Sequence, residues 1–227
     1  CYLDLMSCRS WIAAGVVGCL GALGTAGAAV PALLRDVNQY STSSSPLGAV
    51  VANGRLIFLF SRADVGNELA SIDLATGALQ VLDLEPGSVS SNPTSLVVAG
   101  TKVIFAATTS AHGTEVWRSD GTLLGTAEVI DLVTGPGSSF PTEFALGDDG
   151  LVYFSANDGV HGTELWGTDG TAGGTQLLDL IPGMTSSSPT NITPVQDALL
   201  FAAGAAGAEP WRRTSMGSGQ IRDVRSG

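Results

Sequence analysis

The chain has 227 residues, 44% of them hydrophobic, which is enough to build a sizeable core in one all-β domain or two small domains. Its 21 acidic residues outnumber its 10 basic residues, and the formal net charge is −11 at pH 7. A surface of this charge repels a phosphate backbone. The composition therefore argues against nucleic acid as a partner and favours a soluble protein.

The first 28 residues differ from the rest and have the three parts of a secretory signal peptide. An arginine follows Met6, an apolar run extends over residues 11–23, and small residues lead up to Ala28. The run is too short and too rich in glycine for a membrane span, which takes about 20 strongly apolar residues. We expect translation to begin at Met6 and cleavage after Ala28, giving a protein that is secreted or held at the cell surface.

A second interpretation of this segment is a lipoprotein signal. Val16–Cys19 resembles a lipoprotein processing box in which Cys19 would carry the lipid anchor, although the residues after it stay apolar where a polar tether is typical. All 3 cysteines of the chain precede the expected cleavage point. The mature chain, residues 29–227, would then have no disulfide, no thiol nucleophile and no cysteine ligand for a metal.

An internal repeat with a period of about 48 residues organises the rest of the chain. One phenylalanine stands at the same position of every copy, and one proline follows a serine pair in every copy. The phenylalanines are Phe58, Phe105, Phe154 and Phe201, and the prolines are Pro46, Pro93, Pro141 and Pro189. The copies span residues 36–82, 83–130, 131–178 and 179–227. Matches at so many positions indicate four structural units of one kind.

Each copy contains four short strand-like segments separated by turn residues. In the third copy these are residues 142–146, 151–156, 163–167 and 175–180. The second segment is apolar at consecutive positions, which predicts a strand covered on both faces. Antiparallel four-stranded sheets that repeat in this way predict an all-β fold, a β-propeller-like array of four blades. The alternative is an open β-solenoid or meander array, which stacks its repeats without closing a ring.

The repeats also carry a recurring motif. It reads GTEVWRSDGTLLGT in the second copy and GTELWGTDGTAGGT in the third, and joints of the form DLxPGxxSSxP connect copies. At these residues the chain resembles the ELWxxDGT repeat family of bacterial exported proteins, over about residues 36–227. The resemblance implies an extracellular propeller-like array without a defined common activity. The first copy lacks the tryptophan and the Asp-Gly-Thr turn, and the fourth has Thr214 in place of the aspartate.

The residues of this motif are expected to build the blades, because a residue present in every copy is a poor candidate for a catalyst. The glutamate should bond the adjacent turn, and the tryptophan should pack between blades. These signature residues are Glu115, Trp117, Asp120, Gly121, Glu164, Trp166, Asp169, Gly170, Glu209 and Trp211.

Two features invite a metal, and both have a simpler explanation. Each Asp-Gly-Thr turn supplies one carboxylate that calcium would accept, but Asp-Gly is also a favoured tight turn in which the aspartate bonds its own backbone. His112 and His161 occupy equivalent loops, with no second histidine in reach by sequence, which favours local hydrogen bonds. We expect structural turns and no cofactor, with bound calcium as the alternative.

Two functions remain open. The first is a non-catalytic module for extracellular recognition or adhesion, because no catalytic motif appears and the serine-rich joints offer hydroxyl groups to a polar ligand such as a glycan. The second is a secreted hydrolase or lyase at the propeller axis, where Glu143, Asp148, Asp149 and Glu128 would converge. An array that does not close would leave apolar blade faces, so we also expect self-association.

Overall fold

The computed structural model describes residues 47–205, 207–214 and 217–221, so the expected signal peptide and Cys19 lie outside the described residues. The described part of the chain contains sixteen strands in four antiparallel sheets of four strands each, and it has no helix. The described residues therefore include no helix with the length and apolarity of a membrane span. The predicted all-β fold with four-stranded repeats is confirmed.

Each sheet consists of four consecutive strands in chain order. The first sheet contains β1 (Leu47–Ala52), β2 (Arg55–Arg62), β3 (Gly66–Asp73) and β4 (Leu79–Leu82). The second contains β5 (Thr94–Ala99), β6 (Lys102–Thr109), β7 (Gly113–Ser119) and β8 (Ala127–Ile130). The third contains β9 (Thr142–Leu146), β10 (Val152–Asn157), β11 (Thr163–Thr168) and β12 (Gln176–Leu178). The fourth contains β13 (Thr190–Val195), β14 (Ala198–Ala203), β15 (Glu209–Thr214) and β16 (Gly217–Gln220).

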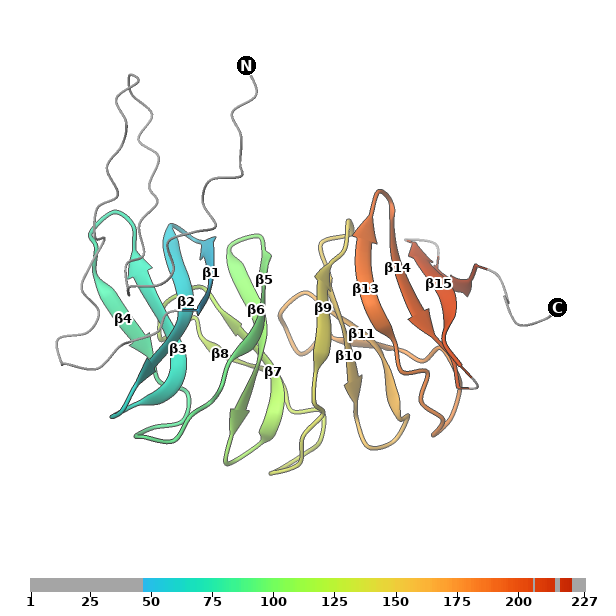
Figure 1. The fold of residues 1–227 in the computed structure, drawn as a ribbon, viewed down its shortest axis with the longest axis horizontal. Helices are drawn as coiled ribbons and strands as arrows, with labels where there is room; N and C mark the ends of the chain where they lie inside the picture. Colours follow the sequence, from blue (N-terminus) through green and yellow to red (C-terminus); the bar gives the residue numbers. More distant parts are fainter. Residues whose placement is uncertain (1–46, 206, 215–216, 222–227) are drawn as a thin grey trace, which may run out of the picture.

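The four sheets stand side by side in chain order (Figure 1). The first strands of neighbouring sheets contact one another, β1 with β5, β5 with β9, and β9 with β13, so these strands form the inner edge of the array. The first and fourth sheets lie at opposite ends of the view in Figure 1. Over the described residues the array is therefore an open arc.

The second strand of a sheet is apolar at consecutive positions because both of its faces are covered. In β6, Ile104 and Phe105 are fully buried, and neighbouring residues of a strand point to opposite faces. Phe105 belongs to the core shared with Ile57 of the first sheet, whereas Ile104 belongs to the core shared with Phe154 of the third. One strand thus fills two successive sheet junctions.

The sheets have two ends with different connections. The joint end carries the loops between second and third strands and the joints that lead to the next sheet. The turn end carries the turns between first and second strands and between third and fourth strands. Backbone hydrogen bonds link the loops at each end. Asn92 N donates to Asn67 O at the joint end, and Leu74 N donates to Gly54 O at the turn end. The histidine loops and the Asp-Gly-Thr turns therefore lie at opposite ends.

Candidate functional site

The glutamate of the motif fixes the joint end. Glu115 is fully buried, its Oε1 accepts a hydrogen bond from Ser139 N at 2.8 Å, and its Oε2 accepts one from Ser139 Oγ at 2.6 Å. Burial raises the pKa of Glu115, and the bonds from Ser139 oppose that shift. The carboxylate ties the second sheet to the joint that leads to the third. The same bonds join Glu68 to Ser91 and Glu164 to Ser187.

The tryptophan of the motif lies at the junction with the preceding sheet. Trp166 is 7% exposed, belongs to the core between the second and third sheets, and donates from Nε1 to Ala156 O at 3.2 Å. Trp117 and Trp211 are partly buried against the first and third junction cores. Glu209 is buried at the start of β15.

Each Asp-Gly-Thr turn closes on itself through its aspartate. Asp120 Oδ1 accepts hydrogen bonds from Thr122 N at 2.8 Å and from Thr122 Oγ1 at 2.7 Å. Asp169 accepts the same two bonds from Thr171, which lower the pKa of Asp169. One oxygen of each turn carboxylate, Oδ1, is thus engaged by the turn itself. Among the described residues, no group of three or more His, Cys, Asp and Glu side chains is placed to hold a metal ion.

The glycine of the turn contacts the preceding sheet. Gly121 has a φ of +84°, and a Cβ atom at this position would lie 2.7 Å from Arg55 Cδ and 3.2 Å from Ile57 Cδ1 of the first sheet. Ser71 Oγ of the same sheet donates to Gly121 O at 2.5 Å. Both the backbone conformation and the close approach require glycine here.

The second junction repeats this contact. Gly170 has a φ of +83°, and a Cβ atom there would lie 3.0 Å from Ile104 Cδ1 of the second sheet. Arg118 Nη1 donates to Gly170 O at 3.1 Å. In both junctions, therefore, the Asp-Gly-Thr turn of one sheet docks on the sheet before it, and a side chain of that sheet donates to the glycine carbonyl.

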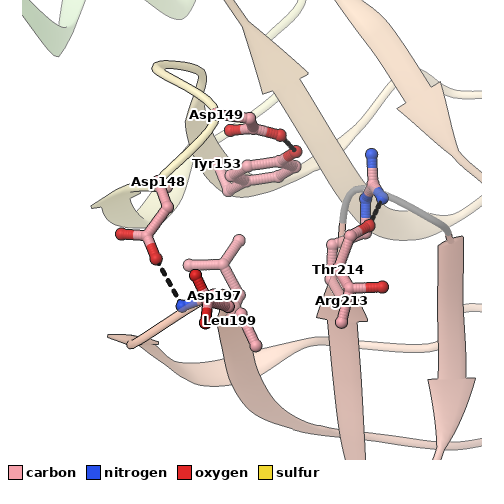
Figure 2. Close-up of a pocket in the computed structure, with 9 residues that line it drawn as sticks. Asp148, Asp149, Tyr153, Asp197, Leu199, Arg213 and Thr214 are labelled. Atoms are coloured by element: carbon pink, nitrogen blue, oxygen red, sulfur yellow. Dashed lines mark hydrogen bonds between the residues drawn. The ribbon is translucent and has the colours of Figure 1, made fainter.

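The third junction lacks such a turn. In the fourth sheet β15 ends at Thr214, and only two residues separate it from β16. The third-sheet position equivalent to Arg118 is Gly167, which has no side chain to donate. A pocket of about 230 Å³ opens at this junction (Figure 2). It is lined by Gly147, Asp148, Asp149, Tyr153, Asp197, Ala198, Leu199, Arg213 and Thr214.

Tyr153 is the aromatic residue of the pocket. A Cβ atom at Gly147 would lie 2.8 Å from the Tyr153 ring, and one introduced at Gly167 would lie 3.1 Å from it, so both positions must be small for the ring to fit. The phenol donates to Asp149 Oδ2 at 2.6 Å (Figure 2). Burial raises the pKa of Tyr153 to about 12, and the bond to Asp149 acts in the same direction. The protonated phenol therefore holds the Asp149 carboxylate at the pocket.

Three aspartates and one arginine give the pocket its charge. Asp148 and Asp149 come from the turn between β9 and β10, and Asp148 Oδ2 accepts a bond from Asp197 N at 2.5 Å. Arg213, at the end of β15, donates to Thr214 O, and its guanidinium carbon lies 5.8 Å from the centre of the Tyr153 ring. Carboxylates accept hydrogen bonds and a guanidinium donates them, so this arrangement suits a polar ligand with several hydroxyl groups.

The structure separates the four carboxylates that the hydrolase hypothesis brought together. Only Asp148 and Asp149 line the pocket. Glu143 lies at the joint end of β9, and Glu128 lies on β8 of the second sheet, where its Oε2 is 2.6 Å from His112 Nδ1. The predicted convergence of all four is therefore wrong. The pocket also lies at the turn end, opposite the serine-rich joints in which we expected a polar ligand.

Each histidine bonds a nearby carboxylate. His161 Nδ1 lies 2.6 Å from Asp158 Oδ2, an arrangement that parallels the contact of His112 with Glu128. These bonds raise the pKa of both histidines above the ordinary value of 6.5. Both residues therefore take part in local ion pairs at the joint end.

Sequence reasoning missed Tyr153, Asp197 and Arg213. These residues could have been found as positions at which one copy differs from the others. Tyr153, for example, stands where the other copies have isoleucine or leucine. Arg213 stands where the second and third copies have the hydroxyl residues Ser119 and Thr168. A search for the positions at which one copy differs from the others points to this junction.

Comparisons with known proteins bear on the fold. No protein-family model matches the chain, and no curated protein matches its sequence. Its structure is similar to a puromycin hydrolase mutant complexed with PGG, with a TM-score of 0.54 and 14% identity over 85% of this chain and 33% of that one. Puromycin hydrolase in a second structure gives a TM-score of 0.50 and 14% identity over 82% of this chain and 31% of that one.

A third similar structure is the β-propeller domain of the Trilobed protease from Pyrococcus furiosus. The TM-score is 0.41 and the identity 12%, over 80% of this chain and 72% of that domain. The chain spans about a third of the length of the puromycin hydrolases it matches. At such identities the likeness concerns the fold alone. The sheet topology and the likeness to puromycin hydrolase make the described residues a β-propeller-like array of four-stranded antiparallel sheets.

Proposed function

We propose that this chain is a non-catalytic recognition module of an exported bacterial repeat protein related to the ELWxxDGT family, and that its third sheet junction binds a small polar ligand. The observation that supports this proposal is the pocket at the junction that lacks an Asp-Gly-Thr turn. A position that serves only to build the repeat should look alike in every copy. A ligand site needs a set of residues that occurs once.

The size and chemistry of the pocket favour one sugar residue at the end of a glycan. A volume of about 230 Å³ lies below the roughly 300–1,000 Å³ typical of pockets for drug-sized ligands. Exposed carboxylates of Asp148, Asp149 and Asp197 can accept hydrogen bonds from sugar hydroxyls, while Arg213 can donate to ring or hydroxyl oxygens.

A glycan array tests the proposal. Residues 29–227 should bind a limited set of glycans, and Arg213→Ala should reduce that binding at least tenfold. Arg212→Ala is the matched control, because Arg212 is the adjacent residue of β15 and points to the opposite face of the sheet, away from the pocket. Equal binding by Arg213→Ala and the unsubstituted protein would contradict the assignment of the pocket.

The second candidate is a propeller-like part of a secreted hydrolase or lyase. Two structures of puromycin hydrolase have a similar fold, and this chain spans about a third of their length; this likeness favours the second candidate. A broad panel of glycoside, peptide and aminoacyl-amide substrates separates it from the first. Turnover that Asp149→Asn or Asp148→Asn abolishes would favour the enzyme and overturn the non-catalytic proposal.

A further inference from the structure

The face of the fourth sheet that points away from the third sheet resembles the two faces on which Asp-Gly-Thr turns dock. In the pairing of β14 with β15, Leu200 lies opposite Arg212. The equivalent pairs are Ile57 with Ser71 in the first sheet and Ile104 with Arg118 in the second. Arg212 thus occupies the register position of the two residues that donate to a glycine carbonyl of the next sheet.

Burial distinguishes this face from its two equivalents. Ile57 and Ile104 are both 0% exposed, because the next sheet covers them, whereas Leu200 is partly exposed and Arg212 is exposed. Pro210 of the fourth sheet is partly exposed as well. At the equivalent position, the other three sheets have apolar residues that face the next sheet, namely Leu69, Val116 and Leu165. The face combines apolar side chains with a hydrogen-bond donor in the arrangement that the first two junctions use.

We propose that this face binds one further repeat whose third and fourth strands are joined by an Asp-Gly-Thr turn. The turn glycine would pack on Leu200, and Arg212 would donate to its carbonyl oxygen, as Arg118 does to Gly170 O at 3.1 Å. The first sheet of a second copy fits this face less well. Its corresponding turn runs from Asp73 to Ala78 without an Asp-Gly-Thr sequence, and Leu74 stands at the position of the docking glycine.

The test extends the full chain by one repeat of known type. Residues 223–227 align with the start of the third repeat at residues 131–135, with the aspartate and the glycine at the two ends conserved, so a second copy of residues 136–178 is appended after Gly227. The extended chain should unfold in one cooperative transition, and Arg212→Ala should lower its melting temperature by several degrees, because a hydrogen bond from a charged donor is lost. In the chain without the extension, where Arg212 is exposed, the same substitution should leave the melting temperature unchanged.

Two further variants check the contact itself. In the appended repeat, the change that corresponds to Gly170→Val should also lower the melting temperature of the extended chain. Combined with Arg212→Ala, it should lower the melting temperature by less than the sum of the two separate effects, because both changes remove the same contact. Arg213→Ala serves as the control and should have the same effect with and without the extension.

Three outcomes would overturn the proposal. One is an appended repeat that stays sensitive to protease, and another is equal effects of Arg212→Ala in both chains. The third concerns the chain without the extension. If light scattering finds a dimer that Arg212→Ala abolishes, a second copy of this chain is the occupant instead of an Asp-Gly-Thr repeat.

Discussion

All three sheet junctions are built from equivalent strands, but the third junction differs from the first two in one turn. In the first two, a glycine with positive φ docks on the preceding sheet and its carbonyl accepts from Ser71 or Arg118. In the third, that turn is absent, the donor position is Gly167, and Tyr153, Asp149 and Arg213 surround a pocket instead.

The difference shows how a repeat protein can gain a pocket without changing its framework. The third junction keeps its apolar core, with Leu165 and Phe201 buried, and it keeps the bonds between Glu164 and Ser187. Loss of one docking turn changes only the turn end of the junction. Two glycines, Gly147 and Gly167, then leave room for a tyrosine ring. Framework and site therefore occupy different ends of the same pair of sheets.

The largest expected effect comes from the tryptophans of the second and third junctions. Trp166→Ala should lower the free energy of unfolding by about 3–5 kcal/mol, because it empties space in a covered core. Trp211→Ala should cost less, since Trp211 is only partly buried. Chemical denaturation measures both. His161→Ala, the control in a partly exposed ion pair, should change the free energy of unfolding far less, and a loss equal to that of Trp166→Ala would mean that the inside and outside of β11 are misassigned.

Glycine substitutions test the docking turns directly. Gly121→Ala should cost about 2–4 kcal/mol, because a positive φ strains an alanine by about 1–2 kcal/mol and the new Cβ atom crowds Arg55 and Ile57. Gly77→Ala imposes the same backbone strain, but its new Cβ atom would meet nothing within 4 Å, so this change should cost only the energy of the backbone strain. Thermal unfolding compares the two variants. Equal losses would remove the docking contact from the explanation.

The histidines give the second and third sheets a pH dependence that the fourth lacks, since residue 206 is alanine. Carboxylate partners raise the pKa of His112 and His161 in the folded protein, so protonation stabilises the fold. This contribution is complete below pH 6.5 and is lost as the pH rises through the raised pKa values. The melting temperature should fall slightly over that range. The pair of changes His112→Gln and His161→Gln should remove this fall, and an unchanged profile would contradict it.

The smallest expected effect is that of calcium. Because Thr122 and Thr171 already bond the turn aspartates, chelator should leave the melting temperature unchanged. An ion that bound only the native state would have to stabilise it. A drop of several degrees in chelator, restored by added calcium, would assign a cation to the Asp-Gly-Thr turns.

The sequence alone determined the repeat, its four strands and the nature of each strand. Period-2 alternation and consecutive apolar residues are local signals, and four copies of one pattern leave little doubt about where strands begin, as at residues 142–146. Asp120 bonding its own turn also follows from local chemistry. These features involve residues close together in the chain.

Only the tertiary structure decided how sheets meet. The contact of Gly121 with Ile57 joins residues 64 positions apart, and the pocket combines the turn after β9 with the end of β15. Nothing within one repeat specifies which sheet its turn will face. The predicted convergence of Glu128 with Asp148 failed for the same reason, because Glu128 lies on the fourth strand of the second sheet and Asp148 lies in a turn of the third sheet. Contacts between repeats depend on the packing of whole sheets, and that packing is not encoded at any single position.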